Sequence, residues 1–425
     1  MKRLESIAAT LPDYDPQSLS AAAVGEFLDR LVEPVTQAQS CGVFEALDRV
    51  LADDVVSPIS VPPHDNSAMD GYAFDSGLLR AGQPLDLRCA GAVFAGRAWT
   101  GALAAGECLK IMTGAVMPAG ADTVVPVELV TVDGEHVRIP ADAVRPGANR
   151  RRRGEDLMAG QAALRRGQVL GPAALGLLAS LGLSTVPVLR RLKVAYFSTG
   201  DEILSLGEAP REGAVYDSNR YTVSGLLRRL GVDVIDMGVI RDDPAALEIA
   251  FREATAQADV VITSGGVSAG DADHTRAMMQ RLGDVVFWRI AMRPGRPMAV
   301  GRLMAHDHQA VLFGLPGNPV AVMVSFLAFV RPALQKMMGM QVRPPLLLPA
   351  RSQDVLRKRP GRTEYQRGVV SRAADGNLQV QTTGDQGSGV LHSMVEANAL
   401  IVLHHDQGPV AAGELVDVLL FDCLV

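Results

Sequence analysis

The sequence predicts a multidomain α/β protein whose central domain is a doubly wound, mostly parallel sheet. At 425 residues, with 48% hydrophobic and 21% charged residues, the chain is long enough to bury several cores. Between residues 191 and 340, short apolar runs alternate with segments of helical period, which is the β-α-β rhythm of a parallel sheet. On both sides of this region, apolar runs broken by Gly and Pro predict smaller β-rich domains.

The first part of the chain is expected to form a helical domain that is split in sequence by a β-rich, lid-like domain. Helical periodicity covers residues 18–31, residues 44–51 and residues 171–181. The side chains that share one face of the first helix are Val24, Phe27, Leu28 and Leu31. The expected helical domain therefore combines residues 15–58 with 158–190, and the β-rich domain covers 59–157. Its expected strands are 85–87, 108–112, 123–127 and 136–139.

Residues 191–340 are expected to form the α/β domain. The expected strands are 193–197, 232–239, 259–263, 285–290 and 310–313. The expected helices are 219–230, 244–256, 271–282 and 319–338. Ser218 and Asp271 are expected N-caps, because their side-chain oxygens can accept from the first free amides of a helix.

The last region, residues 341–425, is expected to form a C-terminal β domain. Short apolar runs follow one another closely after Pro344 and Pro345. The expected strands are 346–348, 366–370, 378–382, 399–403 and 415–419. Strands this short and this closely spaced predict a barrel or a sandwich.

Composition excludes several classes of function. The net charge of -6 and the pI near 5.8 argue against a nucleic-acid partner, which normally demands a basic excess. The four cysteines form no C-x-x-C pair and the eight histidines no H-E-x-x-H, so a zinc site is not expected. No continuous apolar stretch reaches the roughly 18 residues of a membrane span, and the first residues lack a signal-peptide core. We expect no membrane association and a cytoplasmic protein.

A glycine-containing loop follows the predicted strand 259–263. In it, Ser264, Gly265, Gly266 and Ser268 precede a predicted helix, so backbone amides and hydroxyls can approach an anion such as phosphate. The loop is neither G-x-x-x-x-G-K-[ST] nor G-x-G-x-x-G, which removes the best support for an NTPase or a dinucleotide dehydrogenase. A plain turn is the alternative.

Carboxylates follow the ends of several predicted strands of this sheet. They are Asp201, Glu202, Asp242, Asp243, Asp271 and Asp273. Carboxylates beside a phosphate would repel it unless a divalent cation lies between them, and Mg²⁺ is the ion that bridges the two. The sequence therefore implies magnesium, although each acid taken singly can be an N-cap or a solvated charge.

Two further segments are candidates for ligand contact. Arg289, Arg293 and Arg296 surround a Pro-Gly turn and together can bind a dianion, provided that the strand runs unbroken from Arg289 to Arg293. One or more of these arginines can equally lie along apolar surface. Asn318, in Gly314-Leu-Pro-Gly-Asn-Pro319, is either a helix N-cap or a ligand contact.

Seven motifs, in this order, resemble those of the MoeA family of molybdopterin molybdenumtransferases, to which the E domain of gephyrin is related. The motifs are Asp65-Asn-Ser-Ala-Met-Asp-Gly-Tyr-Ala, Met112-Thr-Gly-Ala, Arg152-Arg-Gly-Glu-Asp, Phe197-Ser-Thr-Gly-Asp-Glu, Tyr216-Asp-Ser-Asn-Arg, Ser264-Gly-Gly-Val-Ser and Gly314-Leu-Pro-Gly-Asn-Pro. The resemblance implies four domains, the third like a molybdopterin adenylyltransferase, and a homodimer with shared active sites. It also implies a reaction between molybdate and adenylylated molybdopterin in which Mg²⁺ assists hydrolysis of the phosphoanhydride and AMP is released.

The resemblance also assigns functional residues. These are Asp70, Thr113, Asp156, Glu202, Asp242, Asp273, Arg289, Arg293, Pro316, Pro319 and Ser388. Glu202, Asp242 and Asp273 are the implied metal ligands, and Asp70 and Thr113 are implied to complete the site of the other subunit. Where relatives often carry Lys-Pro-Gly-Lys-Pro, this chain has Arg293-Pro-Gly-Arg-Pro297, so forked guanidinium groups stand where the resemblance implies ammonium groups. Whether they contact molybdate or the phosphate of the pterin stays open.

The resemblance also implies partners. A molybdopterin adenylyltransferase is the implied substrate donor, and molybdoenzymes or cofactor carriers are the implied acceptors. Two alternative functions stay open, which are the adenylyltransferase reaction itself and a gephyrin-like interaction scaffold. The sequence carries no fused adenylyltransferase domain up to Val425, which weakens both alternatives.

Overall fold

The computed structural model describes residues 3–12, 14–267, 274–305 and 307–421. Its contacts divide the chain into two compact units. One unit comprises Met1–Gln39, Asp48–Ala52 and Val188–Val425, and the other comprises Ser40–Leu47 and Asp53–Pro187. The first contains the α/β domain and the C-terminal β domain, and the second contains the β-rich domain.

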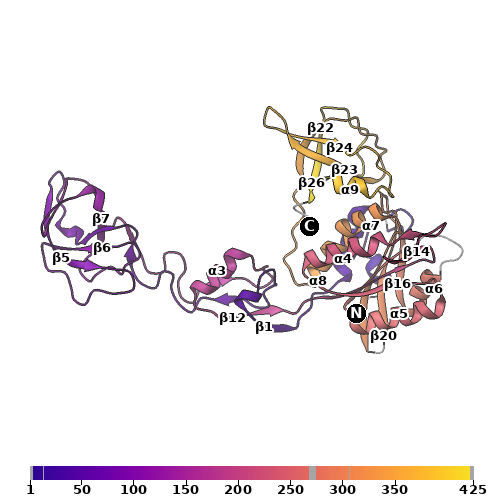
Figure 1. Ribbon diagram of the computed structural model, residues 1–425, viewed down its shortest axis with the longest axis horizontal. Helices are drawn as coiled ribbons and strands as arrows, with labels where there is room; N and C mark the ends of the chain where they lie inside the picture. Colours follow the sequence, from indigo (N-terminus) through magenta and orange to yellow (C-terminus); the bar gives the residue numbers. More distant parts are fainter. Residues whose placement is uncertain (1–2, 13, 268–273, 306, 422–425) are drawn as a thin grey trace. The chain divides into compact units, whose positions relative to one another are not determined.

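A six-stranded sheet forms the centre of the first unit, in the order β16-β13-β17-β21-β20-β18. Figure 1 labels two of its strands, β16 and β20, and the helices α4, α5 and α6. β16, β13, β17 and β21 are parallel, whereas β20 is antiparallel to both β21 and β18. The strands are β13 (Lys193–Thr199), β16 (Asp233–Ile240), β17 (Val260–Ser264), β18 (Gly283–Arg289), β20 (Pro297–Ala305) and β21 (His308–Leu315). The mostly parallel, doubly wound sheet predicted from the sequence is therefore confirmed.

Helices cover both faces of this sheet. α5 (Pro244–Gln257) and α6 (His274–Leu282) pack on one face, where Phe197, Phe251 and Leu312 belong to one buried cluster. α4 (Ser218–Leu230) and α7 (Pro319–Ser325) contact the other face. Because the side chains of a strand alternate between faces, each β-strand supplies apolar residues to both helix layers.

The N-terminal segment packs against the same unit. α1 (Leu4–Ala8) buries Leu4 and Ile7, and α2 (Ala21–Leu31) buries Val24, Phe27, Leu28 and Leu31 as its periodicity predicted. The ring of Phe27 meets Trp288 of β18 edge-on, at 4.9 Å between centroids. The first helix expected in the split helical domain therefore belongs to the α/β unit, whereas α3 (Pro172–Ser180) lies in the second unit.

The long apolar helix after β21 is continuous but changes pitch. α7 passes into a π-helical turn, Phe326–Val330, and then into α8 (Arg331–Met337). The whole segment Pro319–Met337 is long and apolar enough to cross a membrane, but 67% of it is buried inside the protein. Burial of that extent is what a core helix shows.

The C-terminal β domain is a closed barrel. Its strands pair in the cycle β23-β24-β22-β26-β25 and back to β23, and a short strand, β19, adds to β23. The strands are β19 (Met292–Arg293), β22 (Leu348–Ser352), β23 (Thr363–Arg372), β24 (Leu378–Thr382), β25 (Ala399–Leu403) and β26 (Leu415–Leu420). Closure leaves the five barrel strands without a free edge. The one described helix of this domain is α9 (His392–Glu396).

The second unit is built on another six-stranded sheet, in the order β7-β4-β6-β5-β9-β8. Its strands are β4 (Gly71–Phe74), β5 (Leu85–Val93), β6 (Glu107–Ile111), β7 (Thr123–Pro126), β8 (Thr131–Asp133) and β9 (His136–Ile139). Two buried clusters, one around Phe74 and Val125 and one around Leu109 and Val124, pack on its two faces. The predicted β-rich content of this region is confirmed.

Short elements connect these parts. They are β1 (Ala38–Gly42), β2 (Val55–Val56), β3 (Asn66–Ser67), β10 (Arg150–Arg151), β11 (Ala162–Leu164), β12 (Thr185–Leu189), β14 (Ile203–Leu204), β15 (Val215–Tyr216) and the 3₁₀ turns Val43–Glu45, Ser76–Leu78 and Val127–Leu129.

Three local predictions are wrong. The helix expected at residues 44–51 is only the turn Val43–Glu45, because Asp48 adopts a φ of 60°, which a helix does not allow. Asp217, not Ser218, caps α4, since its carboxylate accepts from the Arg220 amide at 3.0 Å. β20 is missed, because it begins at a proline and contains Gly301.

Candidate active site

A cavity of about 410 Å³ lies at the carboxyl ends of β13 and β17. This is the edge of a parallel sheet at which α/β proteins gather their ligands. The described residues that line it are Ser198, Thr199, Glu202, Ile203, Val215, Tyr216, Asp217, Ser218, Asn219, Ser264, Gly265, Gly317, Asn318, Pro319 and Gly389. Four predicted site residues, namely Glu202, Ser264, Gly265 and Pro319, therefore meet at one cavity.

Two helix starts form one wall of this cavity. α4 begins after Asp217 and α7 begins after Asn318. The Asn219 side chain donates to the Gly317 carbonyl at 2.8 Å and so ties the two starts together. Pro319 is the first residue of α7, where its fixed φ favours helix initiation, and Pro316 is buried just before it.

The glycine turn after β17 requires glycine at both positions. Gly265 has φ 92° and Gly266 has φ 66°, and a Cβ on Gly265 would lie 2.5 Å from the Thr199 carbonyl oxygen. The Gly265 amide donates to the Leu315 carbonyl at 3.2 Å, which holds this turn against the end of β21. Ser268, predicted to bind the substrate with this loop, lies outside the described residues.

Three buried hydroxyl groups meet beneath the cavity. The Tyr196 hydroxyl lies 2.9 Å from Ser198 Oγ and 2.7 Å from Ser264 Oγ, and the two serine oxygens are 3.2 Å apart. Burial raises the pKa of Tyr196, so this phenol is neutral at physiological pH. We call this cluster of Tyr196, Ser198 and Ser264 the hydroxyl ring.

The predicted metal ligands are brought only partly together. Glu202 is exposed and lines the cavity, whereas Asp242 is not among its lining residues. The Asp242 amide donates to Asp201 Oδ1 at a long distance of 3.4 Å. Thr275 Oγ1 also lies 3.4 Å from Asp242 Oδ1. Carboxylate oxygens are the donors that Mg²⁺ prefers, but within the described ranges no three acids, histidines or cysteines converge as a metal site. Asp273, the third predicted ligand, and Asp271 lie outside the described residues.

The barrel contributes a loop to this site. Ser388 Oγ accepts from the Asn318 side chain at 3.0 Å, and the Ser388 carbonyl accepts from the Val320 amide at 3.1 Å. Asn318 occupies the N-cap position of α7, but its side chain bonds to Ser388 and makes no capping hydrogen bond. These contacts place Ser388 beside α7, as expected for a site residue, and Gly389 lines the cavity itself.

The arginines lie apart from this cavity. β18 ends at Arg289, and Arg293 belongs to β19, which pairs with the barrel strand β23 instead. The unbroken strand needed to put Arg289 and Arg293 on one face is therefore absent. The side chains of Arg289, Arg293 and Arg296 are all exposed, and the Arg296 carbonyl accepts from the Ile290 amide at 2.7 Å.

Arg293 lines a second cavity, of about 230 Å³, between the 293–294 segment and the barrel. Arg357 and Arg367 line it as well. Arg367 is 1% exposed and donates to Ser393 Oγ and to the carbonyls of Asp385, Gln386 and Gly387. Burial lowers the pKa of Arg367, and Arg293 acts in the same direction. The buried Glu364 lines the cavity too, and Arg362 engages its carboxylate at 2.7 Å. We call this the arginine cavity.

In the second unit, Asp70 and Thr113 form one local structure. Asp70 Oδ1 accepts from the Thr113 amide and from its hydroxyl, both at 2.7 Å. These two hydrogen bonds lower the pKa of Asp70, so its carboxylate is charged at neutral pH. Asp156 is exposed, and its amide donates to the Val61 carbonyl at 3.1 Å.

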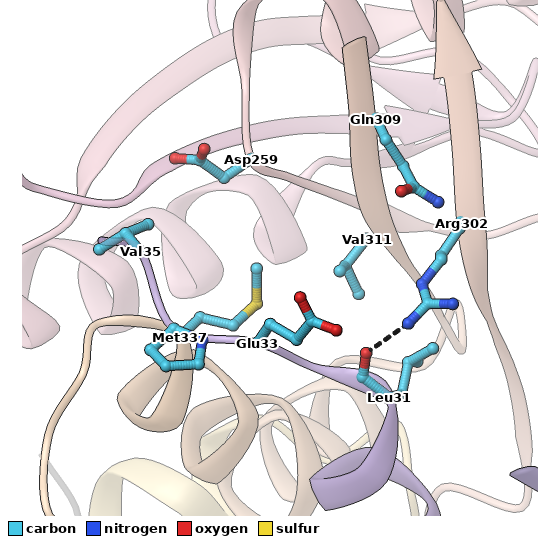
Figure 2. Close-up of a pocket in the computed structure, with 9 residues that line it drawn as sticks. Leu31, Glu33, Val35, Asp259, Arg302, Gln309, Val311 and Met337 are labelled. Atoms are coloured by element: carbon cyan, nitrogen blue, oxygen red, sulfur yellow. Dashed lines mark hydrogen bonds between the residues drawn. The ribbon is translucent and has the colours of Figure 1, made fainter. Parts of the chain in front are cut away.

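A third cavity, of about 150 Å³, lies at the amino ends of β17 and β21 (Figure 2). In it, Arg302 donates to the Leu31 carbonyl at 2.7 Å, the bond that Figure 2 marks. Asp259 is engaged by both terminal nitrogens of Arg190 at 2.7 Å. Although burial raises the pKa of Asp259, the Arg190 and Lys193 hydrogen bonds outweigh it and lower the pKa. These charged groups already have protein partners, so this cavity joins the N-terminal segment to the sheet.

Sequence reasoning missed several residues at the site. Tyr196, Asp217, Asn219 and Arg367 were not predicted to contact a ligand, whereas Ser198 belongs to the Ser198-Thr-Gly-Asp-Glu202 stretch, which was expected to hold one. The sequence signal for two of them is the Asp217-Ser-Asn219 run directly before a helix. The burial of Arg367 has no such signal, because it depends on a loop 18 to 20 residues away in sequence.

Comparison with known proteins agrees with this architecture. Residues 19–182 match the model of the MoeA N-terminal region (domain I and II), 195–336 that of a probable molybdopterin binding domain, and 349–421 that of the MoeA C-terminal region (domain IV).

Relatives extend the similarity to nearly the whole chain. A molybdopterin molybdenumtransferase of Haemophilus influenzae is 42% identical over 95% of this chain and 98% of its own, and one from Nostoc is 36% identical over 99% and 97%. The crystal structure of a MoeA protein from Pyrococcus horikoshii superimposes with a TM-score of 0.82, at 27% identity, covering 95% of this chain and 100% of its own. The chain therefore belongs to the MoeA family of molybdopterin molybdenumtransferases.

Proposed function

We propose that this protein inserts molybdenum from molybdate into adenylylated molybdopterin, with hydrolysis of the phosphoanhydride and release of AMP. The observation that carries the proposal is the cavity at the ends of β13 and β17, where Glu202, Ser264, Gly265 and Pro319 meet. The relatives named molybdopterin molybdenumtransferase supply the reaction class.

In this proposal the protein's own residues bind and orient the substrate. The glycine turn at Gly265 and Gly266 gives the substrate close access to the backbone, and Pro316, Pro319 and Ser388 hold the start of α7 beside it. Glu202, Asp242 and Asp273 would hold Mg²⁺, which would offset the charge that develops on the phosphates as their bridging bond breaks. Water adds across the P–O–P bridge, which releases AMP. The two dithiolene sulfurs of the pterin phosphate bind molybdenum in place of one oxygen of molybdate, and that oxygen leaves as water with the two thiol protons.

Molybdate is proposed to bind at the arginine side of the site. Molybdate is a tetrahedral dianion, and guanidinium groups donate to such oxyanions through charge-assisted hydrogen bonds. Arg293 lines the arginine cavity, and Arg289 and Arg296 flank the same turn, so their exposed side chains can reach a bound anion.

We also propose a homodimer in which Asp70 and Thr113 complete the site of the partner subunit. A molybdopterin adenylyltransferase is the proposed donor of substrate, and molybdoenzymes or cofactor carriers are the proposed acceptors. A cytoplasmic location agrees with the described cysteines, none of which forms a disulfide.

The test is reconstitution from purified components. The protein is incubated with adenylylated molybdopterin, molybdate and Mg²⁺; AMP release is followed by chromatography, and the product is tested for activating an apo-molybdoenzyme. We expect both signals to depend on molybdate and on Mg²⁺. If AMP and active enzyme do not form, the proposed reaction is wrong. Adenylylated product formed from ATP and molybdopterin would instead assign the adenylyltransferase reaction.

A further inference from the structure

Two of the four cysteines lie side by side in the sheet of the second unit. β5 and β6 are parallel neighbours, and their register places Cys89 directly opposite Cys108 (Figure 1). Both residues are free thiols. Side chains alternate between the two faces of a sheet, and directly paired residues of parallel strands share a face. The two sulfur atoms are therefore neighbours.

The alternation along each strand directs both thiols into the same apolar cluster. On β5, Leu87 and Cys89 face the cluster around Phe74, while Arg88 between them is exposed. On β6, Cys108 is 0% exposed and belongs to the same cluster. A buried cysteine taken alone is a small apolar residue, so the pair needs its own explanation.

Hydrogen bonds join the two thiol groups. Cys108 forms one with the side chain of Cys89, and Cys89 Sγ donates to the Gly91 carbonyl at 3.3 Å. Burial raises the pKa of Cys108 to about 12, and the neighbouring Cys89 acts in the same direction. Cys108 is therefore a neutral thiol at physiological pH.

The two thiols differ in their access to solvent. Cys89 is half-buried, whereas Cys108 is fully buried. A reagent in solution therefore meets Cys89 first, and Cys108 reacts only with a group that is already attached to Cys89. An accessible thiol beside a second one is the arrangement in which the second thiol resolves what the first has formed.

The strand geometry permits a covalent bond between the two sulfurs. Neighbouring strands lie about 4.8 Å apart, and disulfides join Cα atoms roughly 4.4 to 6.8 Å apart. A β-bulge between Cys89 and Ala92 interrupts the ladder directly after Cys89, so the strand is held less rigidly there. The apolar surroundings favour a neutral disulfide over the charged complex that two thiolates form with a metal ion.

We propose that Cys89 and Cys108 form a reversible disulfide with a low-molecular-weight disulfide, such as oxidised glutathione, as the oxidant. The Cys89 sulfur attacks one sulfur of the reagent; a mixed disulfide forms, the S–S bond of the reagent breaks, and the leaving thiolate takes the Cys89 proton. The Cys108 sulfur then attacks the Cys89 sulfur and expels the second thiolate, which takes the Cys108 proton. Two protein thiols are oxidised, and one reagent disulfide is reduced to two thiols.

The pair lies outside the cavities described above, so the inference does not depend on the proposed function. It lies in the sheet that carries the Asp70–Thr113 structure, because β6 ends at Ile111 and Gly71 of β4 pairs with that residue. Oxidation would therefore add a covalent link to this sheet.

The experiment maps the disulfide in the folded full chain. The wild type and a Cys41→Ser/Cys423→Ser double variant, which keeps only the two thiols in question, are incubated with oxidised glutathione, alkylated, and digested with trypsin without reduction. Cleavage after Arg88, Arg97 and Lys110 puts the two cysteines on separate peptides, 89–97 and 98–110. We expect mass spectrometry to find these peptides linked, with the loss of two hydrogens, and dithiothreitol to separate them.

Two further substitutions, each made in the double variant, test the order of the steps. With Cys108→Ser, Cys89 should stop at the mixed disulfide, so the protein should gain one glutathione. With Cys89→Ser, Cys108 should stay reduced, because the reagent does not reach it. In the wild type, Cys41 is the control thiol: it is buried on β1 and should remain reduced.

Three outcomes would overturn the inference. They are a protein that stays fully reduced, glutathione bound to Cys89 without any link between the peptides 89–97 and 98–110, and a link that forms only after unfolding in urea. Circular dichroism checks the fold of each variant. Should Cys108→Ser or Cys89→Ser fail to fold, the linked peptides from the wild type and the double variant decide alone.

Discussion

Two cavities of the first unit, the one at the ends of β13 and β17 and the arginine cavity, differ in chemical character. The cavity at the ends of β13 and β17 is lined by hydroxyl and carboxylate oxygens, whereas the arginine cavity presents Arg293, Arg357 and Arg367 together with one buried acid, Glu364. A heterocycle rich in N–H groups fits the first, and an oxyanion such as molybdate fits the second. In the proposed function, this difference would separate the two substrates, with the strand ends binding one and the turn and the barrel binding the other.

The largest effect on activity is expected for Glu202, a carboxylate that lines the cavity at the ends of β13 and β17. Glu202→Gln keeps the size of the side chain but removes its charge, so any Mg²⁺ held there loses a ligand. We expect molybdenum insertion to fall by roughly 10²- to 10³-fold, the scale of a lost electrostatic contact at a reacting centre. The assay is the reconstituted reaction at saturating substrates.

A matched control for this variant is Glu212→Gln, which removes an exposed acid between β14 and β15. Its activity should match that of the wild type. A Glu202→Gln protein that is fully active would remove Glu202 from the proposed metal site.

The next effect concerns the arginine cavity. Arg293→Gln removes a charge-assisted donor, so molybdate affinity should fall by about ten- to hundredfold while pterin affinity stays the same. Titration with each ligand separately measures this. Sulfate and tungstate have the same shape and charge, and both should compete with molybdate in the wild type.

The exposed Arg343, in the segment before the barrel, provides the control variant Arg343→Gln, which should bind molybdate normally. A loss of pterin affinity in Arg293→Gln with molybdate affinity unchanged would reverse the assignment of the two cavities.

A smaller effect extends the comparison to the second unit. If the active site is shared between subunits, mixing Asp70→Asn with Glu202→Gln protein gives heterodimers with one intact and one doubly altered site. With random exchange, about a quarter of the wild-type sites should return. Native mass spectrometry confirms the exchange, and confirmed heterodimers without activity would refute shared sites.

The smallest effect is on the pKa of Asp70. Thr113→Val removes the side-chain hydrogen bond but keeps the backbone one, so the pKa of Asp70 should rise toward its ordinary value. Because the pKa of Asp70 is lowered by folding, its contribution to stability is present above the unfolded pKa and is lost as pH falls through the folded one. In the variant, the pKa of Asp70 should differ less between the folded and the unfolded state, so acidification should remove less stability through this residue.

Carboxyl-carbon NMR titration measures the pKa directly, and Asp54, whose pKa is lowered by Arg166 and Arg165, serves as the unaffected reference. An unchanged pKa of Asp70 in Thr113→Val would show that the Thr113 hydroxyl has no part in it.

The repeating pattern of the sequence predicted most of the fold. The expected strands 378–382 and 399–403 have the bounds of β24 and β25, because both carry clear β-type residues between turns. The helix expected at 244–256 is α5 within one residue at its end, since Pro244 marks its first position. Strand closure into a barrel could not be distinguished from a sandwich, because pairing between distant strands has no local signal.

The site was predicted less completely, for reasons of tertiary structure. The position of Ser264 followed from its place at a strand end, but its contact with Tyr196 depends on the register between β13 and β17. The separation of Arg289 from Arg293 follows from the pairing of β19 with the barrel, which no spacing in the sequence indicates. Local patterns therefore located the edge of the sheet, and packing decided which side chains meet there.

The central claim is that heterocycle and oxyanion bind at separate places. The most direct measurement is a titration of the wild-type protein with pterin in the absence and in the presence of saturating molybdate. Because no described residue lines both cavities, we predict that pterin affinity stays within about twofold. Competition, in which pterin affinity falls in proportion to the molybdate concentration, would show that both ligands use one cavity and would contradict this account.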